Sequence, residues 1–388
     1  MNALLLPERP ADLIEIEEPV RYVRIPLPIA GDIPPEEFFR PVEPRISQIE
    51  RRRIAARAEI AGRLLHKARV EPSPVVLSED HNERGNRYDY VQLPDGRRLA
   101  YSDIGDKRDP AIVAFHGNPV GRKDVWPRAI HNYQRGLRII TFDRPGYGDS
   151  TRDKGHTIWD SALDAQVLVR ALGLGRFAIS GRSGGGPAAM ALAARMPEQV
   201  SSLSLLATVA PPKEMMADRF FNWTRGMSAD NAEKYRLADQ ASIEDLEEIA
   251  MNHALDLQDD PYSFFKMLEP SLTTHDRRVL HGSGLRHLFM RAYDHGLAQY
   301  GVGWADDMHA ISHDWGFSVK DIPDTMTVRI WHGQHDNHAP HAHAEWLARA
   351  ITHARFDSVP FASHFDTFTA FPGILLWHRN LLLDEKEA

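Results

Sequence analysis

Cysteine is absent from all 388 residues of the chain. A disulfide framework, a thiolate nucleophile and a cysteine-ligated zinc site are therefore excluded. By itself this absence says little about the cellular compartment. Any nucleophile or metal ligand has to come from serine, threonine, histidine, lysine or carboxylate side chains.

Long apolar runs and an excess of positive charge are also missing. No stretch approaches the roughly 18 apolar residues that a membrane-spanning helix needs. The first residues, MNALLLPERP, have no basic segment, and their apolar run ends at Pro7 and Glu8. This pattern does not fit a secretory signal, so we expect a cytoplasmic protein. The formal net charge of -8 argues against a nucleic-acid partner, which would require a basic face.

Residues 1–85 differ in composition from the rest of the chain. Their first half is rich in proline and acidic residues, which predicts an extended segment. An amphipathic helix is predicted within 45–70, where apolar residues recur at helical spacing: Ile54, Ala58, Ala61 and Leu65. We favour packing of this helix on its own domain. The alternatives are packing on the helical block described below and a dimerisation arm, which would make the protein a homodimer.

Strand-like and helix-like segments alternate from residue 86 onward. The segments AIVAFHG and LRIITFD are unbroken apolar runs, as expected of strands buried on both faces. Helical patterns such as WDSALDAQVLVRALGL separate them. The alternation predicts an α/β domain with a mostly parallel sheet and helices on both faces. We assign this core to residues 86–210 and 322–388.

The alternation is interrupted between residues 211 and 321, where the sequence is helical throughout. We interpret this block as a cap over the strand ends, the edge at which ligands bind in open α/β sheets. Its aromatic residues fit either an apolar substrate pocket or the cap's own core, and the sequence does not separate the two. They are Phe220, Phe221, Trp223, Phe264, Phe265, Phe289, Tyr293 and Trp304.

The segment FAISGRSGGG, residues 177–186, places one serine among four glycines between a predicted strand and a predicted helix. This context identifies Gly181-Arg182-Ser183-Gly184-Gly185 as a nucleophile elbow. The turn is so sharp that small residues have to flank the serine. Ser183 is thus the predicted nucleophile, at the start of a helix whose partial positive charge favours an oxyanion.

A serine hydroxyl needs a base, and the base needs a group that orients it. In elbow enzymes the acid and then the histidine follow the serine along the chain. This order selects Asp336 and His364, which follow the last two predicted strands. Asp357 and Asp366 are weaker rivals for the acid. Asp143 precedes the serine and is interpreted as a structural turn residue.

Elbow chemistry also requires a second oxyanion donor after the third strand of the domain. The segment His116-Gly117-Asn118 lies there. We assign the two donors to the backbone N–H groups of Asn118 and Gly184. His116 is expected to brace the loop rather than to transfer protons.

The motifs HGNP, FDRPGYGDS, GRSGGG, WHGQHD and ASHF follow one another in an order that resembles the α/β-hydrolase family. The resemblance covers residue 86 to the end, and it implies an eight-stranded sheet. It is strongest to cap-bearing serine esterases and haloperoxidase-like enzymes, which need no cofactor. Carried over residue by residue, it makes Ser183 the nucleophile, Asp336 the acid and His364 the base.

Two positions depart from this pattern. HGNP resembles haloalkane dehalogenases, but those enzymes and the related epoxide hydrolases use an aspartate where this chain has Ser183. Dehalogenation and epoxide opening are therefore disfavoured. Arg182 is unusual before the nucleophile, and we prefer pairing with a neighbouring carboxylate over contact with an anionic substrate group.

A histidine-rich segment around the predicted acid suggests metal binding at first sight. It contains His332, His335, His338, His341 and His343. The segment already holds Asp336, and His341 and His343 point to different faces of a predicted helix. We therefore expect no metal site.

The sequence predicts a serine hydrolase that cleaves an ester, lactone or thioester of a largely apolar small molecule through an acyl-enzyme on Ser183. Two alternatives keep the same triad: a C–C bond hydrolase and an aminopeptidase. A non-catalytic binding protein on a hydrolase scaffold is the alternative from another class.

Overall fold

The computed structural model describes residues 76–82, 84–124, 129–282 and 285–387. The predicted amphipathic helix, and with it the predicted dimerisation arm, lies outside these residues. Among the helices that the model describes, none combines the length and the apolar character needed to cross a bilayer.

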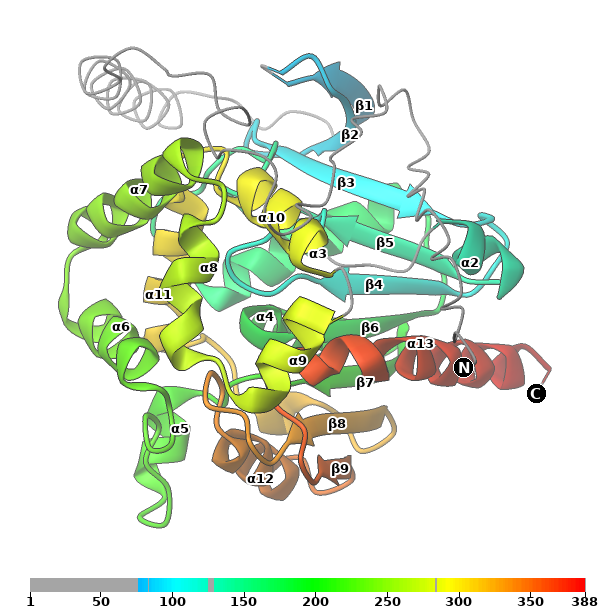
Figure 1. Cartoon of the computed structure of the whole chain (residues 1–388). Coiled ribbons are helices and arrows are strands. Elements are labelled where there is room, and N and C mark those ends of the chain that lie inside the picture. Colours follow the sequence, from blue (N-terminus) through cyan, green and yellow to red (C-terminus); the bar gives the residue numbers. More distant parts are fainter. Residues whose placement is uncertain (1–75, 83, 125–128, 283–284, 388) are drawn as a thin grey trace, which may run out of the picture. The chain divides into compact units, whose positions relative to one another are not determined.

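A single sheet of nine strands organises the described part of the chain, in the order β1-β2-β3-β5-β4-β6-β7-β8-β9 (Figure 1). The strands are β1 (Val76–His81), β2 (Arg87–Gln92), β3 (Arg98–Ile104), β4 (Ala111–Phe115), β5 (Arg138–Phe142), β6 (Phe177–Arg182), β7 (Val200–Leu206), β8 (Thr327–Gly333) and β9 (Arg355–Val359). Neighbours from β5 to β9 are parallel, whereas β1, β2 and β3 pair antiparallel. The predicted α/β class with a mostly parallel sheet is confirmed.

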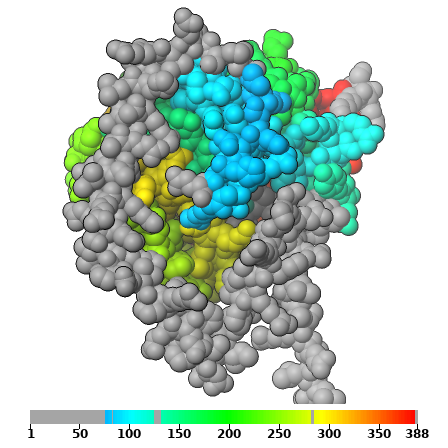
Figure 2. All heavy atoms as spheres, turned by 90° about the horizontal axis from the view of Figure 1, so that it is seen from above, coloured from blue at the N-terminus to red at the C-terminus, as the bar shows by residue number. Residues whose placement is uncertain are grey.

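The sheet has one strand more than the eight expected, because β1 comes from the segment assigned to the extension. Val76–His81 pairs with β2 along its whole length, from Val76 opposite Gln92 to His81 opposite Arg87. Its residues are mostly exposed, as expected for a charged edge strand. In Figure 2 the blue atoms of this strand and β2 lie on the visible face. A short edge strand without a buried face leaves little hydrophobic pattern to detect.

Helices cover the two faces of the sheet. They are α2 (Ala129–Gln134), α3 (Ile158–Ala171), α4 (Gly186–Arg195), α12 (His341–Ala350) and α13 (Thr367–Glu387). Val113 and Phe115 of β4 lie in the core formed with α3, α4 and α12. Ile112 and Ala114 point the other way, into the core formed with α13. This alternation along a strand explains why the central strands are apolar on both faces.

Between β7 and β8 the chain forms a helical insertion, by which we mean residues 212–321. Its elements are α5 (Pro212–Ala217), α6 (Ala229–Gln240), α7 (Ile243–Asp259), α8 (Ser263–Leu268), η3 (Glu269–Ser271), α9 (Thr274–Gly282), α10 (Leu285–Gly296), α11 (Val302–Ser312) and η4 (Val319–Asp321). Figure 1 shows α6, α7, α8 and α11 gathered at one end of the strands, while α13 extends to the opposite end.

The structure separates the aromatic residues that the sequence left unassigned. Five of them pack in a second core, which the insertion forms together with Val120, Tyr147 and Phe365 from the loops of the sheet: Phe264, Phe265, Phe289, Tyr293 and Trp304. Trp223 is buried in the main core, with Phe221 packed against it. Phe220 is 71% exposed and belongs to neither core.

The strand order places the functional loops. After β4 the chain continues to β5 on one side, and after β6 it continues to β7 on the other side. The loops after these two adjacent parallel strands therefore leave in opposite directions. Such a reversal opens a crevice at the carboxyl edge of the sheet. Phe115 pairs with Gly181, so both strands end at the same level.

Candidate active site

Ser183 occupies a sharp turn between β6 and α4. β6 ends at Arg182, a 3₁₀ turn covers Ser183–Gly185, and α4 begins at Gly186. Ser183 has φ of 49°, which is rare for a residue with a side chain and typical of a functional turn. A Cβ atom on Gly185 would lie 2.4 Å from the His116 carbonyl oxygen, and one on Gly186 only 1.9 Å from Thr208 Oγ1. The glycines after the serine are therefore required by close packing.

The structure brings the three predicted side chains together. His364 Nε2 lies 3.1 Å from Ser183 Oγ, and His364 Nδ1 lies 2.9 Å from Asp336 Oδ2. Asp336 follows β8, and His364 begins the short η5 turn (His364–Asp366) that follows β9. His364 and Asp336 are both buried, so their hydrogen bond is shielded from water.

The surroundings of Asp336 favour its ionised form. Its Oδ1 accepts hydrogen bonds from the backbone N–H groups of His338, at 2.8 Å, and Ala339, at 2.9 Å. His332 Nε2 lies 3.3 Å from Oδ2. Burial by itself would raise the pKa of Asp336, but the interactions with His364 and His332 outweigh it and hold the pKa well below its usual range.

The two rival carboxylates have other partners. Asp357 pairs with Arg329, at 2.5 Å, and with Arg355, at 3.0 Å. Asp366 Oδ2 accepts from the backbone N–H of Ser363 at 2.8 Å and caps the turn that carries His364. Only Asp336 among these three candidates bonds to the imidazole.

The loop after β4 lies against the elbow. A Cβ atom on Gly184 would lie 2.6 Å from Asn118 Cγ, so the two predicted oxyanion donors belong to adjacent residues in space. Asn118 Oδ1 accepts a hydrogen bond from Arg144, while its Nδ2 is buried without a partner. His116 accepts from the Arg144 backbone N–H at Nε2, and its Nδ1 donates to the Gly117 carbonyl oxygen at 2.8 Å.

His116 is fully buried, and this burial lowers its pKa to about 3. It is therefore neutral at physiological pH, which leaves its Nε2 able to accept from the Arg144 backbone N–H. This geometry agrees with a role in bracing the loop.

Arg182 pairs with a neighbouring carboxylate, as preferred from the sequence. Its Nη2 lies 2.6 Å from Asp124 Oδ2, and both side chains are buried. The guanidinium also lies over the ring of Phe368, with 4.7 Å between Cζ and the ring centroid.

A buried ionic network, which the sequence analysis did not single out, joins the loop after β5 to the insertion. Asp307 of α11 pairs with Arg144 at 2.6 Å and accepts from the Tyr147 hydroxyl at 2.8 Å. His156 Nε2 lies 3.1 Å from the other carboxylate oxygen. Because Arg144 also binds Asn118, the network extends from the insertion to the loop after β4.

The pKa of His156 makes the stability of this network dependent on pH. Burial lowers the pKa, but bonding to Asp307 outweighs it and raises the pKa to about 9. A pKa raised in the folded state adds stability that is complete below the unfolded pKa, near 6.5, and is lost as pH rises through 9. In urea unfolding, we expect the stability advantage of wild type over His156→Gln to shrink by about 3 kcal/mol between pH 6 and 9.5. A difference in unfolding free energy that stays constant across this pH range would contradict the raised pKa of His156.

The histidine-rich segment does not form a common site in the structure. His332 donates to the Ala339 carbonyl oxygen, His343 accepts from the Ala210 backbone N–H, and His341 bonds to Ser358. The three imidazoles thus have separate partners.

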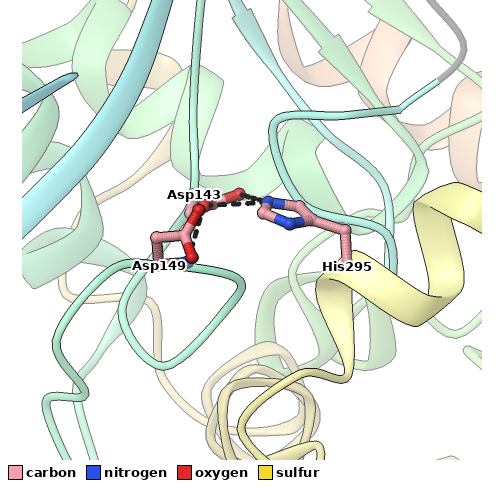
Figure 3. A group of neighbouring side chains, drawn as sticks. All are labelled: Asp143, Asp149 and His295. Carbon is pink, nitrogen blue, oxygen red and sulfur yellow. Dashed lines mark hydrogen bonds and ion pairs between the residues drawn. The ribbon is translucent and has the colours of Figure 1, made fainter. Parts of the chain in front are cut away.

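A different group, Asp143, Asp149 and His295, brings potential metal ligands within 4.8 Å of one another (Figure 3). Arg122 already ion-pairs with both carboxylates, and His295 Nε2 lies 3.0 Å from Asp143 Oδ1. Burial would raise the pKa of Asp143, but the Arg122 guanidinium and the hydrogen bond to His295 outweigh it and hold the pKa well below its usual range. A metal ion would have to displace the guanidinium. The group instead links helix α10 to the loop after β5, which supports the structural role predicted for Asp143.

Comparisons with known proteins agree with this architecture. A non-heme haloperoxidase from Rhodococcus erythropolis is 27% identical over 286 residues, which cover 71% of this chain and 92% of that protein. A proline iminopeptidase from Xylella fastidiosa is 34% identical over 116 residues, but these span only 29% of this chain and 37% of the peptidase.

Solved structures show the same fold at low identity. The enol-lactonase from Burkholderia xenovorans is 20% identical with a TM-score of 0.52, and the match covers 74% of this chain and 97% of the lactonase. A thermophilic esterase from Thermogutta terrifontis is 19% identical with a TM-score of 0.51, over 80% of this chain and 99% of the esterase. A family model described as the alpha/beta hydrolase fold matches residues 110–371. The chain therefore belongs to the α/β-hydrolase fold family.

Proposed function

We propose that this protein is a serine hydrolase that cleaves an ester, lactone or thioester of a largely apolar small molecule. The observation that carries the proposal is the run of hydrogen bonds from Ser183 through His364 to Asp336, at 3.1 and 2.9 Å. It begins at the half-buried Ser183, on a turn of positive φ at the carboxyl edge of the parallel strands.

The proposed reaction has two stages. His364 Nε2 takes the proton from Ser183 Oγ as the oxygen attacks the carbonyl carbon, and the backbone N–H groups of Asn118 and Gly184 stabilise the oxyanion. The imidazolium, held by Asp336, then protonates the leaving alcohol or thiol as the C–O or C–S bond breaks. In the second stage water gives a proton to His364 and attacks the acyl carbon. The bond from this carbon to Ser183 Oγ then breaks, the imidazolium returns the proton to Oγ, and the acid is released.

Aromatic side chains surround the base, and we propose on this basis that the substrate is largely apolar. Phe365 follows His364 directly and packs edge-to-face on Phe289 of the insertion, with centroids 5.3 Å apart. Phe368 packs on Phe289 as well, at 4.9 Å. A relative from Acinetobacter calcoaceticus, 31% identical over 124 residues, bears the name of an esterase and perhydrolase. The match spans 45% of that protein. This similarity supports the proposal of ester cleavage.

Aminopeptidase activity is the second candidate, favoured by the partial identity to proline iminopeptidases. It needs a carboxylate available to the substrate's amino group. Asp124, beside the elbow, is already paired with Arg182. We therefore place ester cleavage first.

A fluorophosphonate probe and a substrate panel test the proposal. We expect the probe to modify Ser183, as peptide mass spectrometry would locate it. In the panel, p-nitrophenyl butyrate should be turned over with a larger kcat/KM than proline p-nitroanilide or a β-diketone. A chain that is folded but not labelled would fit a binding protein instead, and preference for the anilide would select the peptidase.

A further inference from the structure

Asp276 is a buried carboxylate of the helical insertion that bonds to both neighbours of His364. Its side chain is inaccessible to solvent. The hydroxyl of Ser363 donates to Oδ2 at 2.7 Å, and the backbone N–H of Phe365 donates to Oδ1 at 3.0 Å. Figure 1 shows α9, which carries Asp276, beside the start of α13, just after the turn that holds His364.

The same carboxylate also caps its own helix. The hydroxyl of Thr273 donates to Asp276 Oδ2 at 2.7 Å, and the Asp276 backbone N–H donates to Thr273 Oγ1 at 3.1 Å. A second capping box in the insertion has matching bonds, between Ser242 and Asp245 at 2.6 and 3.2 Å. Asp245, however, is exposed and serves only its own helix in the bonds described.

This contrast indicates that capping alone does not account for Asp276. Burying an ionised carboxylate is costly unless hydrogen bonds or cations compensate it. Within the described part of the chain no lysine, arginine or histidine forms an ion pair with Asp276, and its compensation comes from hydrogen bonds. Two of these lead to the turn that holds the base.

The insertion also contacts the loop of the acid, through Ser271 near Asp276 and through helix α6. Asn337, which follows Asp336, donates from Nδ2 to the Ser271 carbonyl oxygen at 2.7 Å. Asn231 of α6 donates to the His338 carbonyl oxygen at 2.6 Å. Residues 271–276 thus contact the loop of the acid at one end and the loop of the base at the other.

We propose that Asp276 is a positioning residue, through which the insertion sets the place of the catalytic base. The inference rests on the proposed role of His364. Asp276 is buried and bonds to the two neighbours of His364 rather than to the imidazole. It holds the residues on either side of His364, so that the imidazole stays within hydrogen-bond reach of Ser183 Oγ. Small displacements of reacting groups have large effects on rate, because a nucleophile and its base must be aligned.

The test compares Asp276→Ala and Asp276→Asn with the matched cap variant Asp245→Ala. With p-nitrophenyl butyrate, we expect Asp276→Ala to lower kcat about 10- to 100-fold while KM changes by less than about 3-fold. Asparagine should restore part of kcat, because its oxygen can accept from Phe365 and its amide can donate to Ser363. Asp245→Ala should leave kcat within about 2-fold of wild type. Equal kcat losses at 245 and 276, or none at 276, would overturn the inference.

Amide hydrogen exchange at Phe365 supplies a readout that does not depend on catalysis. Asp276→Ala should accelerate exchange of this N–H, whereas Asp245→Ala should not. If Asp276→Ala accelerates exchange while the wild-type protein neither hydrolyses esters nor reacts with the probe, the proposed function is refuted but the contact of Asp276 with the turn is supported. Unchanged exchange of the Phe365 N–H in Asp276→Ala would refute the proposal that Asp276 holds this turn. If Asp276→Ala does not fold, Ser363→Ala replaces it in the test, because it removes one of the bonds to the carboxylate. It must then lower kcat, by less than about 10- to 100-fold, with little change in KM.

Discussion

Replacing Ser183 with alanine is expected to lower kcat for an activated aryl ester by about 10⁴-fold or more, with the fold intact. The hydroxyl supplies the attacking oxygen and lies 3.1 Å from His364 Nε2. Among the described hydrogen bonds, this nitrogen bonds to no other hydroxyl. Alanine keeps the Cβ atom and therefore the packing of the turn. Initial rates with p-nitrophenyl butyrate would measure the loss.

The same variant should also lose labelling by the fluorophosphonate probe. Circular dichroism and the midpoint of urea unfolding serve as controls, because a global loss of structure would mimic a chemical effect. Full turnover in a folded Ser183→Ala protein would end the acyl-enzyme proposal. Lost turnover with labelling retained would move the nucleophile to another residue.

Replacing Asp307 with alanine is expected to cost roughly 3–5 kcal/mol of unfolding free energy, the usual result of removing one partner from a buried ion pair. The change leaves Arg144 buried without its main counter-ion, since the guanidinium loses contacts at 2.6 and 3.0 Å. It also removes the acceptor of Tyr147 and the partner that keeps His156 protonated. Urea unfolding at pH 7 would measure the cost.

An exposed ion pair in the same insertion provides the control. Lys213 and Asp314 lie 3.1 Å apart, with side chains 81% and 66% exposed. Asp314→Ala should change stability by no more than about 1 kcal/mol, because water screens such pairs. Equal effects of the two substitutions would mean that the Asp307 network contributes no more than a surface pair.

The candidate site was largely predictable because its parts follow rules that operate along the chain. The serine sits in a pattern that only a strand–turn–helix explains, and close contacts at Gly185 and Gly186 show why no side chain fits there. Asp336 and His364 were selected by chain order, since each follows a strand of a parallel sheet and parallel strands end at one edge. Their convergence on Ser183 is then a consequence of topology.

Less of the helical insertion could be predicted from the sequence. Its helices were recognisable from their periodicity, but its aromatic residues were divided between two cores only by packing. Asp276 and Asp307 resemble ordinary helix residues in the sequence. Their importance depends on which loops of the sheet they meet, and these loops lie 89 and 163 positions away along the chain.

The sequence by itself determined the α/β class, the sharp turn at Ser183 and the order of the candidate catalytic residues, because periodicity, glycine sterics and strand order are written locally. Only the tertiary structure decided that β1 joins the sheet, that Arg144, Asp307 and His156 form one buried network, and that Asp276 meets both neighbours of His364. These contacts join segments with no fixed spacing between them, and burial, which sets their strength, is a property of the folded chain.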